Sequence, residues 1–141
     1  MLHNFSEFLS KSAGLYASTL SNLFFRRGPV SMPNTPKNLK DIRSLVEVVS
    51  HLRGPHGCPW DQEQTHTSLA RYAIEETHEM VEALEERESC RLANKNKTPE
   101  DFARATEKFK DELGDVLFQV VLHAQLASEE QAFTFDDIVQ N

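Results

Sequence analysis

The chain has 141 residues, with 15 basic and 22 acidic side chains and a formal net charge of −7. This length suits one domain of ordinary size, or a smaller domain with a tail. The acidic balance argues against nucleic acid as a partner, because a phosphate backbone attracts Lys and Arg. It does not argue against a nucleotide as a ligand, because a bound divalent cation reverses the local sign of the charge. No stretch is long and apolar enough to predict a membrane span.

The first part of the chain differs in composition from the remainder. Residues 1–40 carry 5 basic side chains against one acidic side chain, and the first thirty are rich in Ser. The stretch "RRGPVSMPNTPKN" has the Pro, Gly, Ser and Asn content of a linker. We therefore predict an N-terminal extension and linker over residues 1–36, ahead of a helical domain over 37–141. The extension fits a transit-type presequence, a surface or partner helix, or a dispensable segment before a start at Met32.

The two cysteines, Cys58 and Cys90, lack the Cys-x-x-Cys spacing of redox and zinc sites. The simplest interpretation is a pair of buried thiols in a reduced, cytoplasmic protein. Four histidines also lack a metal-ligand spacing, and we interpret them as structural: His51, His56, His66 and His123.

From residue 39 onward, apolar residues recur at steps of three and four, which predicts helices rather than strands. The first helix is expected over 39–53, where the Gly and Pro residues of "GPHGCPWD" end it. Asp61 is the expected N-cap of a second helix that runs to about residue 89. This part of the chain therefore predicts two helices in succession.

The second half of the chain continues the helical pattern. Thr98 and Pro99 are typical of an N-cap and a first helical position, so a third helix is expected over 99–127. Its stretch "VLFQVVLHAQLA" is apolar nearly all round, which predicts a central helix. A fourth helix is expected to begin after Thr134. The whole pattern predicts an all-α fold.

Two acid pairs interrupt the apolar stripes of the second and third helices. Helical spacing places Glu76 in a gap of the first stripe, with Glu79 one turn further. Glu112 fills the matching gap in the third helix, and Asp115 follows it by one turn. Gly114 between them costs helix stability, which we interpret as close approach by another helix or by a ligand.

Buried carboxylates must be paired, protonated or bound to a metal. A set of oxygen ligands selects Mg²⁺ or Mn²⁺, and Mg²⁺ readily takes phosphate oxygens as further ligands. The predicted chemistry is therefore metal-assisted attack of water on a phosphoanhydride. One alternative is a solvated acidic face. Another is a di-iron carboxylate bundle, whose Glu-x-x-His element matches Glu75 and His78, although the third helix offers no second such element.

Three stretches together resemble the MazG family of nucleoside triphosphate pyrophosphohydrolases: "HLRGPHGCPWDQEQTHTSL", "IEETHEMVEAL" and "KDELGDVLFQVVLHAQLA". The resemblance implies an all-α helical bundle of the all-α NTP pyrophosphatase type, completed by oligomerisation as a homodimer or homotetramer. It also implies Mg²⁺-dependent hydrolysis of a nucleoside triphosphate to the monophosphate and pyrophosphate, with Mn²⁺ as a substitute metal. The implied role is house-cleaning of the nucleotide pool.

The family's functional residues carry over to matching positions of this sequence. The resemblance implies Glu76, Glu79, Glu112 and Asp115 as metal ligands. It also implies that Glu75 binds metal or orients water, that Trp60 and Asp61 contact the nucleotide, and that Lys108 reaches a phosphate.

Two alternatives to this function stay open at the level of sequence. The first is a phosphoribosyl-ATP type of substrate, because that activity uses a similar helical acid site. The second is a non-catalytic helical dimer that binds a nucleotide or a protein. It is favoured by the end of the chain at Asn141, where family members usually continue through another helix and a basic segment.

Overall fold

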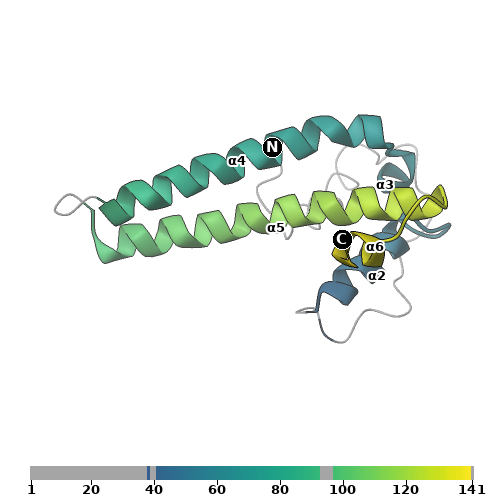
Figure 1. Cartoon of the computed structure of the whole chain (residues 1–141), viewed down its shortest axis with the longest axis horizontal. Coiled ribbons are helices and arrows are strands. Elements are labelled where there is room, and N and C mark those ends of the chain that lie inside the picture. The colour runs from purple at the N-terminus through teal and green to yellow at the C-terminus, as the bar shows by residue number, and fades with distance from the viewer. Residues whose placement is uncertain (1–37, 39–40, 93–96, 141) are drawn as a thin grey trace, which may run out of the picture.

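The computed structural model of the chain describes residues 38, 41–92 and 97–140, and all regular secondary structure within them is helical (Figure 1). The predicted extension over 1–36 lies outside these residues. The prediction of an all-α fold is confirmed. Within the described ranges, no helix combines the length and hydropathy that a membrane span needs. The helices are α2 (Ile42–Arg53), α3 (Pro59–Glu63), α4 (His66–Leu92), α5 (Pro99–Glu129) and α6 (Phe135–Gln140).

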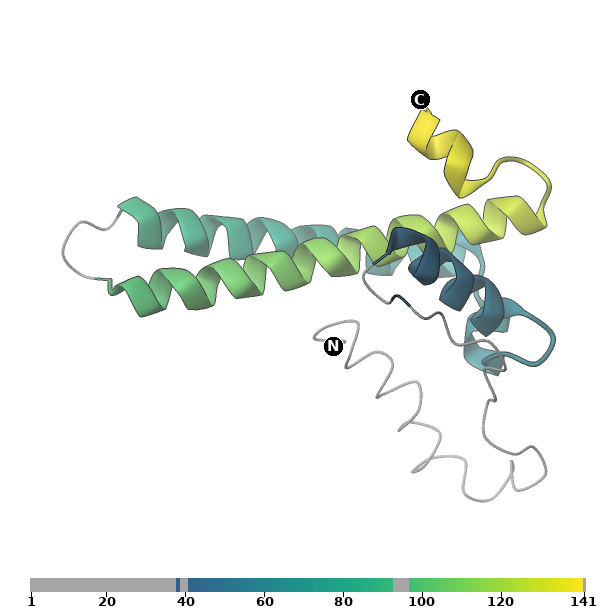
Figure 2. The ribbon, with the colours of Figure 1, turned by 90° about the horizontal axis from the view of Figure 1, so that it is seen from below.

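The two long helices, α4 and α5, form an antiparallel hairpin, and the shorter helices gather at one end of it (Figures 1 and 2). α5 contacts α2, α4 and α6, as expected of a central helix. The main hydrophobic cluster lies at this end, and α5 supplies most of it. Its buried members are Val49, Leu69, Phe118, Val121, Leu122 and Leu126.

Two helix starts follow the predicted capping chemistry. Thr98 accepts a hydrogen bond from the Asp101 backbone N–H, and the Asp101 carboxylate accepts one from the Thr98 backbone N–H. Thr134 and Asp137 repeat this reciprocal arrangement before α6. Each box satisfies backbone donors that a helix start leaves open, so these sequence signals fix where α5 and α6 begin.

The predicted N-cap at Asp61 is wrong. Asp61 lies inside α3, which starts two residues earlier with Pro59 at a favourable first position. Its side chain is fully buried instead of facing an open helix start. α4 begins after Thr65, whose hydroxyl accepts a hydrogen bond from the Ser68 backbone N–H. The second predicted helix is therefore two helices.

One face of the hairpin leaves apolar side chains exposed. Leu113, Leu117 and Val120 recur at steps of four and three along α5 and remain 44%, 41% and 38% exposed. A Cβ atom added at Gly114 would meet no atom within 4 Å. The expectation that another helix approaches Gly114 closely is therefore not met by the described part of this chain.

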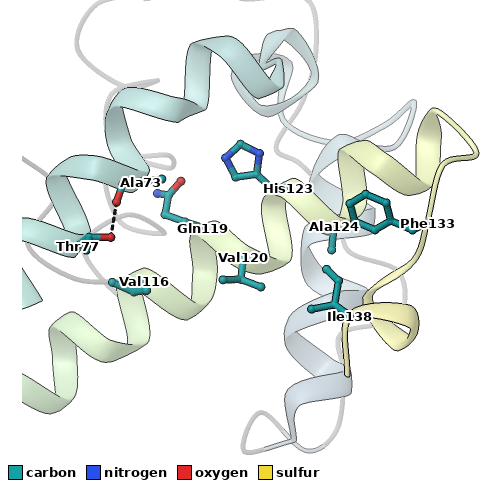
Figure 3. A pocket seen from close by; sticks show the side chains of 9 residues that line it. All are labelled: Ala73, Thr77, Val116, Gln119, Val120, His123, Ala124, Phe133 and Ile138. Atoms are coloured by element: carbon teal, nitrogen blue, oxygen red, sulfur yellow. Dashed lines mark hydrogen bonds between the residues drawn. The ribbon is translucent and has the colours of Figure 1, made fainter. Parts of the chain in front are cut away.

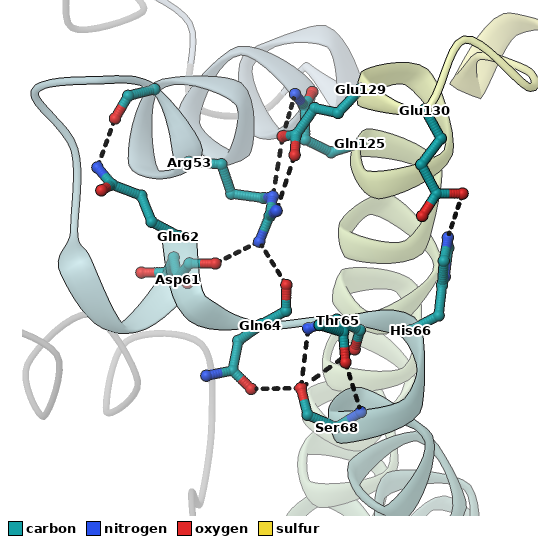
Figure 4. A network of polar contacts seen from close by, with 11 residues as sticks. Arg53, Asp61, Gln62, Gln64, Thr65, His66, Ser68, Gln125, Glu129 and Glu130 are labelled. Carbon is teal, nitrogen blue, oxygen red and sulfur yellow. Dashed lines mark hydrogen bonds and ion pairs between the residues drawn. The ribbon is translucent and has the colours of Figure 1, made fainter.

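Arg53, the last residue of α2, joins three elements (Figure 4). Its side chain is 6% exposed. Its guanidinium group donates hydrogen bonds to the backbone carbonyls of Asp61 and Gln64, at α3 and its end. It also forms a two-point ion pair with Glu129 at the end of α5, over 2.9 and 2.7 Å. This network fixes the segment before α4 against α5.

We expect Arg53→Ala to lower the free energy of unfolding by about 2–4 kcal/mol, because it leaves two carbonyls and a carboxylate without their charged donor. Urea denaturation measures this loss. Arg104→Ala is the matched control, because the ion pair of Arg104 with Asp101 is exposed and contributes less than about 1 kcal/mol. Equal losses in the two variants would show that the network does not hold the helices together.

Candidate functional site

Three carboxylates meet between α4 and α5. Glu76 on α4 and Glu112 and Asp115 on α5 are 6%, 7% and 7% exposed. One oxygen atom of each lies within 4.8 Å of one oxygen atom of each of the others. The spacing of three between Glu112 and Asp115 puts both on one side of α5, and the burial shows that this side faces inward. The hairpin thus gathers three acids from positions far apart in the sequence.

The electrostatics of this carboxylate cluster are unfavourable for three negative charges. Burial, followed in order of effect by the neighbouring carboxyls of Asp115, Glu79, Glu112 and Glu75, raises the pKa of Glu76 to about 7. Every neighbouring group behind this shift is another acid. The Oε2 atom of Glu76 is buried and has no hydrogen-bond partner within the described chain. A cation is the simplest group that would compensate such a cluster.

Two further acids of α4, Glu75 and Glu79, lie beside the carboxylate cluster. Glu79, one turn further along α4, is half-buried, whereas Glu75 is exposed. Both are near enough to raise the pKa of Glu76. The group within 4.8 Å contains Glu76, Glu112 and Asp115. The structure therefore brings together three of the four residues expected to bind metal and leaves Glu79 at their edge.

Trp60 and Asp61 occupy anchoring positions in the core. Trp60 is half-buried, packs against both hydrophobic clusters and meets Tyr72 edge to face, with ring centroids 6.3 Å apart. Asp61 is fully buried. Burial raises the pKa of its carboxyl group, and the Cys58 side chain and the Arg53 charge oppose this shift in part. Neither residue belongs to the carboxylate cluster.

Lys108, the expected phosphate contact, lies on the surface of the hairpin. It is one turn before Glu112 on α5, and its Nζ atom is 3.1 Å from a carboxylate oxygen of Glu86. Its side chain is 49% exposed. The position leaves its ammonium group accessible to a ligand that displaces Glu86.

One residue of the site region was missed by the sequence analysis. Gln119 follows Asp115 by one turn of α5 and is 8% exposed. It lines a pocket together with His123 (Figure 3). The signal was present in the sequence, because Gln119 continues the polar line of Glu112 and Asp115 at a step of four. The sequence did not single out Gln119, because the residues around it are apolar.

Comparison with known proteins gives a consistent result. A family model described as the MazG nucleotide pyrophosphohydrolase domain matches residues 64–141. The nucleoside triphosphate pyrophosphohydrolase/pyrophosphatase MazG of Thermotoga maritima is 43% identical over 99 residues, which are 70% of this chain and 32% of that protein. The nucleoside triphosphate pyrophosphohydrolase of Escherichia coli K12 is 41% identical over 101 residues, 71% of this chain and 32% of that protein.

A third relative carries no functional name. The uncharacterized protein YabN of Bacillus subtilis is 43% identical over 100 residues, which are 71% of this chain and 17% of that protein. The chain therefore spans about a third or less of the length of these three curated relatives. No solved structure matches it.

The raised pKa of Glu76 predicts a pH dependence of stability in the metal-free protein. The unfolded chain releases this proton near the ordinary value of 4.5, whereas the folded chain holds it to about 7. Between these values the folded state binds more protons, so stability falls as pH rises, by at most about 3 kcal/mol.

Urea denaturation in a chelator at about pH 5 and about pH 8 measures this loss. Glu76→Gln should remove most of it, because the amide does not titrate. Glu85→Gln, an exposed position on the same helix, should leave it unchanged. The same pH dependence in wild type and Glu76→Gln would contradict the electrostatic account.

Proposed function

The chain belongs to the MazG nucleotide pyrophosphohydrolase family, and from this premise we propose that it hydrolyses nucleoside triphosphates to monophosphate and pyrophosphate. The observation that carries the proposal is the buried cluster of three carboxylates within 4.8 Å. The cluster and a triphosphate are both negatively charged and repel each other. The cluster therefore suits such a substrate only when cations bind with it. Two relatives that are named pyrophosphohydrolases support the same class of reaction.

The donor set fits Mg²⁺, with Mn²⁺ as a substitute. All the ligand atoms are carboxylate oxygens, and Glu76 offers a buried oxygen with no hydrogen-bond partner in the described residues. Glu76, Glu112 and Asp115 would hold the metal, and Glu79 would complete the set from its half-buried position. When bound, the metal neutralises the triphosphate oxygens and lowers the pKa of a coordinated water molecule.

The protein's own groups would then have distinct roles. The cluster would repel a triphosphate that arrives without a cation, which makes binding depend on the metal. Glu75, exposed beside the cluster, would accept a proton from the attacking water. Lys108 would contact a phosphate after releasing Glu86. Because Asp61 has no exposed surface, its role would be to hold α3, and with it Trp60, in place for the nucleotide.

We also place the protein in the cytoplasm, where it would remove surplus or non-canonical nucleotides. We further propose that oligomerisation completes the fold. Leu113 and Leu117 form an exposed apolar stripe on α5. A second hairpin packed on this stripe would make a four-helix bundle, as a dimer or within a tetramer. The open space at Gly114 would let the two helices approach closely.

The catalytic proposal predicts Mg²⁺-dependent release of pyrophosphate from a panel of canonical and damaged nucleoside triphosphates and phosphoribosyl-ATP. Glu76→Gln and Asp115→Asn should each lower kcat/KM by about 100-fold or more, because each removes a metal ligand. Glu85→Gln and Asp111→Asn make the same chemical changes at exposed positions of α4 and α5 and should retain activity. Nucleotide binding without release of pyrophosphate would favour the non-catalytic alternative.

The oligomerisation proposal predicts that Leu117→Asp yields a smaller species in sedimentation velocity, because it buries a charge in the subunit interface. Leu92→Asp, at the exposed end of α4, serves as the control and should leave the sedimentation coefficient unchanged. A wild-type protein that sediments as a monomer at all concentrations would refute the proposed bundle.

A further inference from the structure

A pocket of about 290 Å³ is lined by residues of α4, α5, the segment before α6 and α6 itself (Figure 3). Its walls are mostly apolar. Ala73 contributes from α4, Val116 and Ala124 from α5, and Phe133 and Ile138 from the end of the chain. This composition suits a flat organic ring better than a phosphate.

Gln119 brings a buried polar atom without a described partner into the pocket lining. The Thr77 hydroxyl donates to the Ala73 carbonyl at 2.7 Å, and the His123 Nδ1 atom is 2.8 Å from the His66 Nδ1 atom. Gln119 is more than nine-tenths buried, and its Oε1 atom has no hydrogen-bond partner within the described residues. Figure 3 shows the side chains of Gln119 and His123 projecting from α5 toward α4. A buried carbonyl oxygen without a donor is costly, so a ligand donor at this point would stabilise the site.

The pocket and the carboxylate cluster lie on neighbouring stretches of the same two helices. Thr77 follows Glu76 on α4, and Val116 follows Asp115 on α5. Along α5, Gln119 lies one turn beyond Asp115 and His123 lies two turns beyond it, at about 5.4 Å per turn. A nucleotide whose phosphates lie at the carboxylates would extend its sugar and base over such a distance.

We propose that this pocket receives the nucleoside part of the substrate, and that Gln119 is a specificity-determining residue that accepts a hydrogen bond from it. The inference rests on the proposed function, which places the triphosphate at Glu76, Glu112 and Asp115. The donor is either a sugar hydroxyl or an N–H group of the base, since both offer the same chemistry. An aliphatic side chain from a second subunit fits less well, because it would bury the Gln119 oxygen without a donor.

The test compares Gln119→Met with wild type. Methionine keeps the length of the side chain and removes the amide. We expect kcat/KM for the preferred nucleotide to fall by about 10- to 100-fold, mainly through KM, with a weaker preference among nucleotides. Inhibition by inorganic triphosphate with Mg²⁺ should not change, because this probe has no nucleoside. Gln125→Met, a half-buried glutamine of α5 outside the pocket, should behave as wild type.

The panel separates the two donor sources. Loss of discrimination between ribose and deoxyribose assigns the hydrogen bond to the sugar, and loss of the ranking among bases assigns it to the base. An unchanged KM and ranking in Gln119→Met would overturn the inference. So would an equal weakening of inorganic triphosphate inhibition, because that result shows a general disturbance of the site.

A binding experiment keeps this inference distinct from the catalytic proposal. If wild type released no pyrophosphate, the catalytic proposal would fail, and titration with nucleoside monophosphates would still test the pocket. Monophosphate binding that is weakened by Gln119→Met, and not by Gln125→Met, supports the pocket. Equal monophosphate binding by both variants and wild type overturns it.

Discussion

The structure depends on one constraint, which is that three carboxylates lie buried between the two helices of the hairpin. Glu76, Glu112 and Asp115 occupy positions that a packed helix pair would normally fill with aliphatic side chains. Their mutual repulsion and burial oppose association of α4 and α5 in the absence of a cation. The hairpin must therefore be stabilised elsewhere along its length, and the metal that would bind here would also remove a cost of folding.

That stabilisation lies at one end. Val49 of α2 and Leu69 of α4 pack against the C-terminal half of α5, and Arg53 ties α2, α3 and α5 by charged hydrogen bonds. The segment "GCPWD" supports this end from within, through the buried Asp61 and the packed Trp60. It thereby anchors the segment that precedes α4.

The sequence predicts the helices well because their signals are local. Apolar residues at steps of three and four define the stripes of α4 and α5, and Thr98 and Thr134 mark helix starts through contacts three residues away. The break between α3 and α4 was missed because it depends on tertiary contacts. Pro59 starts a short helix early, and the side chain of Asp61 turns into the core where Cys58 and Arg53 lie.

The part of the candidate site that depends on helical periodicity could be predicted from the sequence. Glu76, Glu112 and Asp115 fall in gaps of apolar stripes, so their inward direction can be read from spacing. Which oxygens come within reach of one another depends on the register between α4 and α5, and no local signal sets that register. The pocket at Gln119 also depends on Phe133, which the chain brings back against α5. Helical periodicity does not predict such a long-range contact.

The position of the main hydrophobic cluster has a dynamic consequence. Between the carboxylates and the far end of the hairpin, the buried apolar side chains of the described residues are small, namely Ala83, Cys90 and Ala105. This distal half therefore has less buried apolar area to resist local opening than the half that α2 and α6 cover. A ligand that bridges α4 and α5 at the carboxylates would suppress that opening. Occupancy of the site would then be visible as slower amide hydrogen exchange in helical turns that the ligand never touches.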